Sequence, residues 1–220
     1  MGVRDVVVAI DGPSGSGKSS TARRVAARLG LRYLDTGAMY RALTWWMLQH
    51  EIDVTDPERV AAHADEPALA CGTDPAGPTI SVDGVDVAAA IRTQPVTSAV
   101  SAVSAVPDVR ARLKADQRDL IGAGGIVVEG RDIGTVVAPD AQVKIFLTAA
   151  PDARASRRSA ELAGASLAAT RADLARRDAA DSERVASPLR MADDATPVDT
   201  TAHTLDEVVE IVISLVEQEG

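Results

Sequence analysis

The sequence has little of several features that would define its class. Among 220 residues there is one cysteine, Cys71, which excludes an internal disulfide and a cysteine-based zinc site and suits a reducing compartment. We expect its thiol to act as a small buried hydrophobic group. No apolar run approaches the length of a membrane span, and no basic stretch followed by an apolar core forms a signal peptide at the N-terminus. These absences favour a soluble, cytoplasmic protein.

Positive charge is also scarce. The chain has 23 lysines and arginines against 32 aspartates and glutamates, a net charge of −9, which argues against nucleic acid or anionic membranes as general partners. The lysines are Lys18, Lys114 and Lys144, and every other basic residue is an arginine. Genome bias accounts for this skew better than function does, so each arginine is judged by its position.

The most informative segment that is present runs from Gly12 to Ser19 and reads Gly-Pro-Ser-Gly-Ser-Gly-Lys-Ser. It follows an apolar strand pattern and precedes a helical one, which is the context that a phosphate-binding loop requires. Its glycines let consecutive N–H groups point into one concavity at a helix N-terminus. Lys18 can reach the β- and γ-phosphates, and the Ser19 hydroxyl can ligate Mg²⁺. The chain is therefore expected to bind ATP with Mg²⁺ through Gly12, Pro13, Ser14, Gly15, Ser16, Gly17, Lys18, Ser19 and Ser20.

Strand and helix patterns alternate along the chain, which predicts an α/β fold with a parallel sheet between helices. Near-continuous apolar runs indicate buried parallel strands, and apolar positions at helical spacing indicate helices. Strands are expected at 6–10, 31–34, 125–129, 143–147 and 198–200. Helices are expected at 18–29, 39–49, 57–64, 95–121 with a break at Pro107, 151–177 with a break near Gly164, and 208–216 behind a capping box at 204–207.

Two segments depart from this alternation. Residues 53–78 are rich in proline and glycine, and the runs 79–82 and 85–87 flank Asp83-Gly84, a strong hairpin signal. This hairpin is expected to belong to an inserted lobe. Residues 178–189 are polar and are expected to be mobile.

Four further places carry candidate site residues. Thr36 and Arg41 are spaced to hold a small phosphate, although Thr36 could equally be only a helix N-cap. Glu129 ends an apolar strand, where P-loop enzymes place the carboxylate that steadies Mg²⁺, directly or through water. Arg131 and Asp132 follow at the same edge, which makes a mere surface ion pair the weaker interpretation.

The other two places are rich in arginine. Arg154, Arg157 and Arg158 share one helical face, for which solvent exposure is the default. The segment from Arg177 to Arg184 could be a charged linker or a lid that brings arginines to a transferring phosphoryl group.

Together these motifs resemble the bacterial cytidylate kinase family. The resemblance rests on the loop 12–19, on 35–41 (Asp-Thr-Gly-Ala-Met-Tyr-Arg), on 91–94 (Ile-Arg-Thr-Gln), on 130–137 and on 177–184 before Pro188-Leu189. It runs in order from about residue 6 to residue 217. It implies a P-loop kinase fold with a core (about 1–35, 105–150 and 190–220), an acceptor lobe (about 36–104) that carries a small antiparallel sheet, and a mobile lid (about 153–188).

The resemblance also implies transfer of the γ-phosphoryl group of ATP to CMP or dCMP. It assigns Ser101, Arg110 and Asp132 to the cytosine, since a carboxylate accepts from the cytosine amino group and would leave a buried charge unpaired against uracil. It assigns Thr36, Arg41, Arg131 and Arg184 to the acceptor phosphate, Arg177 and Asp181 to the sugar, and Arg154, Arg157 and Arg158 to the vicinity of ATP.

Catalysis is then expected to need no general base, because the acceptor oxygen is already anionic. Alignment and charge neutralisation by Mg²⁺, Lys18, Arg131, Arg177 and Arg184 would suffice, with Asp132 aligning the acceptor through its base. Two alternatives remain open from the residues alone: a small-metabolite kinase resembling shikimate kinase, and a nucleotide sensor without catalysis. Since no extended apolar seam demands a partner, a monomer is expected.

Overall fold

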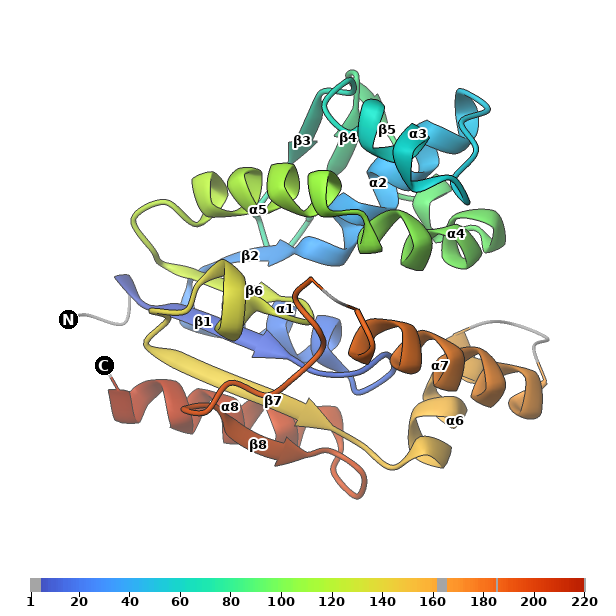
Figure 1. Cartoon of the computed structure of the whole chain (residues 1–220). Coiled ribbons are helices and arrows are strands. Elements are labelled where there is room, and N and C mark those ends of the chain that lie inside the picture. Colours follow the sequence, from blue (N-terminus) through green and yellow to red (C-terminus); the bar gives the residue numbers. More distant parts are fainter. Residues whose placement is uncertain (1–4, 162–165, 185, 220) are drawn as a thin grey trace.

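The computed structural model describes residues 5–161, 166–184 and 186–219. Its centre is a five-stranded sheet in the order β2-β6-β1-β7-β8, in which every neighbouring pair is parallel (Figure 1). This arrangement confirms the predicted parallel sheet. The strands are β1 (Val7–Asp11), β2 (Arg32–Asp35), β6 (Ile126–Glu129), β7 (Val143–Thr148) and β8 (Thr196–Asp199).

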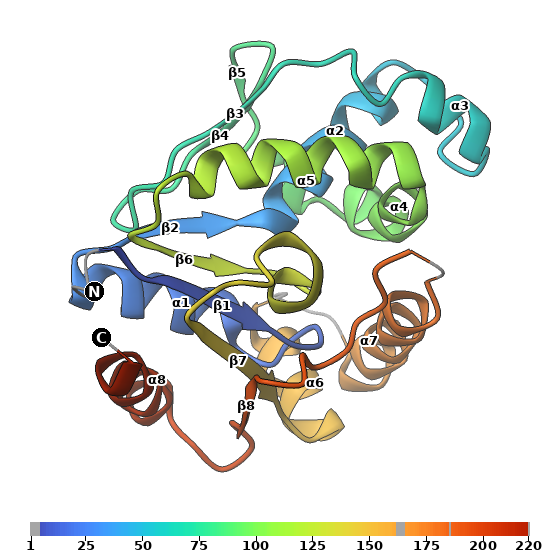
Figure 2. The same ribbon diagram turned by 60° about the vertical axis from the view of Figure 1, so that its left-hand side comes forward.

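Helices cover both faces of this sheet, as Figure 2 shows. On one face, α1 and α8 bury Val25 and Val212 against alternate residues of the strands, such as Val8 and Ile145. On the other face, α2, α4 and α5 pack against residues such as Val128. The helices are α1 (Lys18–Leu29), α2 (Thr36–Gln49), α3 (Pro57–Ala62), α4 (Gln94–Ala105), α5 (Pro107–Ile121), α6 (Pro151–Glu161), α7 (Leu167–Ser182) and α8 (Leu205–Glu219), with one short turn at η2 (Ala90–Arg92) and another at η3 (Ile133–Val137).

The inserted lobe carries its own antiparallel sheet, made of β3 (Leu69–Cys71), β4 (Ile80–Val82) and β5 (Val85–Asp86). The two central turn residues, Asp83 and Gly84, have φ of 50° and 80°, the backbone that a two-residue hairpin turn requires. The predicted hairpin is therefore confirmed. A hydrogen bond from Tyr33 N–H to Thr73 O, at 2.8 Å, ties the lobe to the core. This bond also occupies a backbone donor of the edge strand β2.

Several other predictions are also confirmed. Pro107 begins a new helix after a break, and Pro151 stands at the start of α6. Thr204 and Glu207 form the expected capping box, since Thr204 N–H donates to Glu207 Oε2 at 2.7 Å and Glu207 N–H donates to Thr204 Oγ1 at 3.3 Å.

Three local predictions were wrong. α2 begins at Thr36 rather than Met39, because the Asp35 carboxylate accepts from Ala38 N–H at 3.0 Å and caps the helix there. Residues 69–71, expected to be irregular, pair with β4. α7, which was expected to end at Arg177, continues through Ser182, because Arg177 and Asp181 are buried on it. The helix break predicted near Gly164 lies outside the described residues.

In the described part of the chain, no helix is both long enough and apolar enough to cross a bilayer.

Candidate active site

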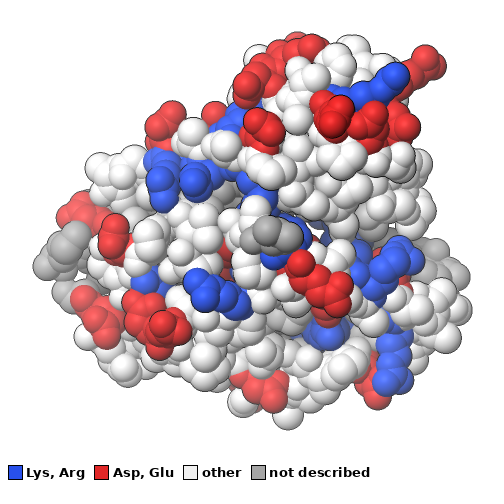
Figure 3. Space-filling view, in the orientation of Figure 1, with Lys and Arg blue, Asp and Glu red and all other residues white. Residues whose placement is uncertain are grey.

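A cavity of about 350 Å³ lies beyond the carboxyl ends of β1, β2 and β6, where open parallel sheets bind ligands. Figure 3 shows a hollow in the surface with Lys and Arg at its border. Five groups of elements meet at the cavity: the loop between β1 and α1, the start of α2, the α4 and α5 pair, the end of β6, and α6 with α7. The side chains that line it include Lys18, Ser19, Thr36, Arg41, Ser101, Arg110, Glu129, Arg131, Asp132, Arg158, Arg177, Asp181 and Arg184.

The phosphate-binding loop is shaped by the close approach of two strands. Gly12 has φ of 147°, and a Cβ there would stand 2.1 Å from the Leu147 carbonyl oxygen. At the other end of the loop, Gly17 is left-handed and no side chain caps α1 within the described residues, so the first N–H groups of the helix remain available to an anion. The buried Ser16 hydroxyl has no hydrogen-bond partner among the described residues, which also fits a loop built for a ligand.

Lys18 and Glu129 face each other at the bottom of the cavity, and both are buried. The Lys18 ammonium donates to Pro13 O at 2.7 Å. Burial, assisted by the nearby charge of Arg131, lowers the pKa of Lys18. Burial and the charge of Asp35 raise the pKa of Glu129. Burial thus disfavours the charged forms of both side chains, and a highly charged ligand would compensate for this.

Glu129 has two hydroxyl partners. Tyr33 Oη donates to its Oε1 at 2.6 Å, and the Ser19 hydroxyl also hydrogen-bonds to it. A carboxylate beside a serine hydroxyl, next to free N–H groups of a phosphate-binding loop, is a donor set that fits Mg²⁺ carried by a nucleotide. Tyr33 was not expected in the site from the sequence.

Helix α7 contacts the phosphate-binding loop through Asp178. Ser14 N–H donates to Asp178 Oδ1 at 3.2 Å. Arg154 of α6 ion-pairs with Asp178 and donates to Ser14 O at 3.0 Å. Arg154 therefore lies at the loop. Asp178 contacts the loop as well, and the sequence did not predict this, although Asp178 directly follows Arg177.

The other two arginines of α6 lie differently. Arg158 lines the cavity. The structure does not bring Arg157 to the cavity: its guanidinium donates to Thr200 Oγ1 at 2.8 Å and to Thr200 O at 2.6 Å. The Thr200 hydroxyl in turn lies within hydrogen-bond distance of Ser16 O, at 3.2 Å, and of Thr148 O, at 3.0 Å, so Arg157 supports the phosphate-binding loop from behind.

An arginine cluster forms the part of the cavity next to α2. Arg41 donates to Thr97 Oγ1 at 3.0 Å, and burial together with the charges of Arg177 and Arg158 lowers its pKa to about 10. Such mutual repulsion between cations is relieved by a bound anion. Thr36 is not the N-cap of α2, a role taken by Asp35. The Thr36 hydroxyl donates to Glu129 O at 2.7 Å, so in this structure its proton is committed to the protein.

Arg110 and Asp132 form a buried ion pair between α5 and the end of β6. Their side chains are each 8% exposed. The Arg110 guanidinium lies 5.5 Å from the centroid of the Tyr40 ring and donates to Ser104 O at 3.2 Å, while its Nε has no partner among the described residues. The pair is thus held in place with donor capacity left over.

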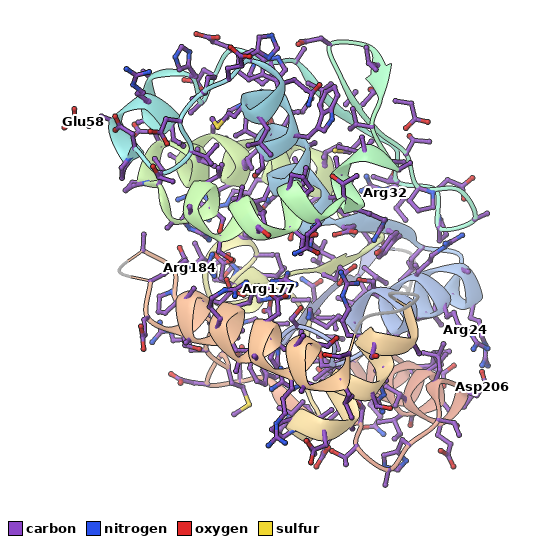
Figure 4. The ribbon with its side chains drawn as sticks, turned by 90° about the vertical axis from the view of Figure 1, so that its right-hand side faces the viewer. Arg24, Arg32, Glu58, Arg177, Arg184 and Asp206 are labelled. Atoms are coloured by element: carbon purple, nitrogen blue, oxygen red, sulfur yellow. The ribbon has the colours of Figure 1, made fainter. Side chains whose placement is uncertain are left out.

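The last group of charges lies on α7 and directly after it. Asp181 accepts from Arg131 Nε at 2.8 Å and lies 3.9 Å from Arg184 Nη2. Arg184 Nη2 is buried without a hydrogen bond among the described residues. Figure 4 shows Arg177 and Arg184 on the side of α7 that faces α4 and α5. The structure therefore brings Arg131, Arg177, Asp181 and Arg184 together, as the sequence predicted.

Comparison with known proteins agrees with this geometry. A family model described as "Cytidylate kinase" matches residues 8–218. A protein of Streptomyces avermitilis named cytidylate kinase is 64% identical over 97% of this chain and 93% of its own length. One of Streptomyces coelicolor with the same name is 65% identical over the same shares of each chain.

Solved structures with this fold have quite different sequences. The crystal structure of an uncharacterized protein from Eubacterium ventriosum matches with a TM-score of 0.54 at 12% identity, covering 97% of this chain and 99% of that one. At that level of identity the likeness concerns the fold alone.

Proposed function

The chain belongs to the cytidylate kinase family, and from this premise we propose that it transfers the γ-phosphoryl group of ATP to CMP or dCMP, giving ADP and CDP or dCDP. The observation that carries the proposal within the structure is the buried Arg110–Asp132 pair beside the arginine cluster. A carboxylate accepts from the amino group of cytosine, and a guanidinium donates to its ring nitrogen and carbonyl oxygen. A shikimate-like kinase has no use for such a pair.

The donor side is proposed to hold ATP on the loop Gly12–Ser20. Free N–H groups at the start of α1 support contacts with the phosphates, and Lys18 lies where its ammonium can neutralise the transferring group. Arg154 and Arg158 are proposed to contact the phosphates from α6, whereas Arg157 acts through Thr200.

Mg²⁺ is proposed to be held by the Ser19 hydroxyl and, through water, by Glu129. Held there, it would supply positive charge to offset the negative charge of the phosphate oxygens. Because Tyr33 donates to one oxygen of Glu129, the carboxylate is oriented before any ligand arrives.

The acceptor side is proposed to divide into three parts. Ser101, Arg110 and Asp132 read the base, and Arg177 and Asp181 contact the sugar. The phosphate is held by Arg131, Arg184 and Arg41. Thr36 lies at the N-terminus of α2, the helix that also carries Arg41. The buried Nη2 of Arg184, which makes no hydrogen bond within the described part of the chain, supports an anion at this place.

The chemistry proposed is an in-line displacement without a general base. The acceptor phosphate oxygen is anionic at neutral pH, so Lys18 and the surrounding arginines need only align the two nucleotides and neutralise charge. A core, an acceptor lobe and a lid over about 153–188 stay a proposed division, and residues 162–165 and 185 of the lid lie outside the described chain. The monomeric state and the cytoplasmic location also stay predictions.

A coupled assay of ADP release tests the function. With ATP and Mg²⁺ present, CMP, dCMP, UMP, AMP and shikimate are compared as acceptors. We expect turnover on CMP or dCMP to exceed that on UMP and AMP by orders of magnitude, and none on shikimate. Equal rates on CMP and UMP would contradict base reading by Asp132. Absence of turnover on every acceptor would favour a nucleotide sensor instead.

A further inference from the structure

A buried carboxylate joins the phosphate-binding loop to the segment that carries Arg131 and Asp132. Asp11 ends β1 directly before Gly12 and is 5% exposed. Its Oδ1 accepts from Ile133 N–H at 2.9 Å, and its Oδ2 accepts from Gly134 N–H at 2.8 Å. Each carboxylate oxygen therefore holds one N–H group at the start of η3, a five-residue π-helical turn.

The other end of the same turn is held by a group of opposite charge. Arg118 of α5 donates from Nε to Val137 O and from Nη2 to Val136 O, both at 2.9 Å. An anion at the N–H end and a cation at the carbonyl end match the dipole of a helical turn. η3 is thus fixed at both ends by side chains that line no part of the cavity.

The position of η3 sets the position of Asp132. Asp132 directly precedes the turn and pairs with Arg110. The turn is also seated by Ile133, which is 1% exposed and whose Cδ1 lies 2.6 Å from where a Cβ on Gly130 would stand. A small rotation of η3 would therefore move the Asp132 carboxylate relative to the base that it reads.

We propose that Asp11 is a positioning residue which, through η3, places Asp132 and Arg131 and so sets the selectivity of the acceptor site for a cytidine nucleotide. This inference rests on the function proposed above. Because Asp11 adjoins Gly12, the same carboxylate also fixes the distance between the donor loop and the acceptor-reading segment.

Asp11 needs both of its carboxylate oxygens, because the two N–H groups of Ile133 and Gly134 need two acceptors. In Asp11→Asn the amide oxygen can accept from one of them, while the amide NH₂ meets the other N–H, donor against donor. We expect η3 to shift and the misplaced Asp132 to cost about tenfold in selectivity, since displacements below 1 Å already reduce rates strongly.

The experiment compares three variants with the wild type, measuring kcat and KM for CMP and UMP at saturating ATP, and KM for ATP at saturating CMP. Asp11→Asn should raise KM for CMP and lower the CMP-to-UMP ratio of kcat/KM about tenfold, with KM for ATP within about twofold. Arg118→Ala, which touches η3 without touching the donor loop, should lower the ratio in the same direction.

Arg32→Ala is the matched control. Its guanidinium also holds carbonyl groups, those of Leu120, Ile121 and Gly124 at 2.7–2.8 Å, but at the end of α5 rather than at η3. We expect it to lose stability without a change in the CMP-to-UMP ratio. Thermal melts of all variants record how far each one is destabilised.

Two results would overturn the inference: an unchanged ratio in both Asp11→Asn and Arg118→Ala, or a rise in KM for ATP while KM for CMP stays constant. If Asp11→Asn does not fold, the ratio measured for Arg118→Ala decides. A wild type that is inactive on CMP would contradict the proposed function itself. An active wild type whose variants keep its selectivity contradicts only the role of Asp11.

Discussion

Asp132 and Arg110 neutralise each other in the structure, so a bound base must be compatible with both. Each is buried, and each would be left with an uncompensated charge if the other were truncated. Replacing Asp132 with alanine therefore mixes two effects, a lost contact to the base and an unpaired Arg110. The isosteric change to asparagine also removes the negative charge, but it keeps an oxygen that can accept from Arg110 and an NH₂ that can donate to a base.

The variant Asp132→Asn gives the sharper prediction. Its amide NH₂ can donate to the uracil carbonyl that replaces the cytosine amino group, so we expect kcat/KM for CMP to fall by about 10³-fold or more while that for UMP falls far less or rises. Steady-state kinetics on both nucleotides measure this. Asp132→Ala should lower both values, CMP more than UMP. If each variant lost the same factor in kcat/KM on CMP as on UMP, Asp132 would serve structure and not base recognition.

Two glycines of the phosphate-binding loop differ in what surrounds them, although both have positive φ. A Cβ on Gly12 would meet the Leu147 carbonyl at 2.1 Å, whereas a Cβ on Gly17 meets nothing within 4 Å. We expect Gly17→Ala to cost about 1–2 kcal/mol of stability from backbone strain alone. Gly12→Ala should cost more than about 4 kcal/mol, because β1 and β7 must separate. Urea unfolding measures both, and similar costs would contradict the close approach at Gly12.

Among the helices, α7 shows most clearly where the sequence was insufficient. Its segment 178–182 is polar, which predicted mobility, yet Asp178 and Asp181 are held by Arg154 and Arg131 from elsewhere in the chain. Local patterns do not contain such long-range pairs. By contrast, the buried strands and the loop 12–19 were predictable, because continuous apolar runs and a glycine-rich motif are properties of neighbouring residues.

The residues of the candidate site divide in the same way, into those that a local sequence pattern predicts and those that it does not. Residues within recognisable motifs, such as Lys18, Arg131 and Asp132, were expected from the sequence, and the cavity contains them. Asp11 and Arg118 were not expected, since their partners are backbone groups of η3, and nothing in the sequence signals a π-helical turn at 133–137. For Asp11 one signal existed: like Glu129, it is an acidic residue at the end of a buried strand.

The contact of α7 with the phosphate-binding loop through Asp178 predicts how firmly this helix is held without nucleotide. Asp178→Ala removes the acceptor of Ser14 N–H and the partner of Arg154. We expect backbone amides of 167–182 to exchange hydrogen about tenfold faster or more in the nucleotide-free variant, because the helix opens more often. Hydrogen exchange followed by mass spectrometry measures this.

Asp173→Ala is the control on the same helix, since Asp173 forms a local ion pair with the exposed Arg176. It should leave the exchange of 167–182 within about twofold of the wild type, as expected for a surface ion pair. Equal exchange in the two variants would contradict a latch at Asp178.

The molecule as a whole reconciles an acidic chain with an anionic ligand. The net charge is −9, yet arginines contributed by α2, α5, α6 and α7, together with Arg131 and Arg184, gather at one cavity. Carboxylates at the outer surface and cations in a partly enclosed hollow direct the electric field inward (Figure 3). Position, and not composition, thus decides which of the arginines line the cavity.

The same buried carboxylate that links the two halves of the site predicts how global stability depends on pH. Burial raises the pKa of Asp11 from 3.8 to about 6, against the opposing effect of its two backbone hydrogen bonds. The folded protein therefore holds this proton more tightly than the unfolded chain. The stabilisation is complete below about pH 3.8 and is lost as the pH rises through about 6.

Asp11→Asn has no such proton, so comparing it with the wild type isolates the effect. We expect the free energy of unfolding of the wild type, relative to that of Asp11→Asn, to fall by about 2 kcal/mol between pH 4 and pH 7. Urea unfolding at closely spaced pH values, without nucleotide or Mg²⁺, measures the difference, in which all other titrating groups largely cancel. A constant difference across this range would mean that Asp11 is already ionised at pH 4. In that case its hydrogen bonds to Ile133 and Gly134 outweigh the cost of its burial.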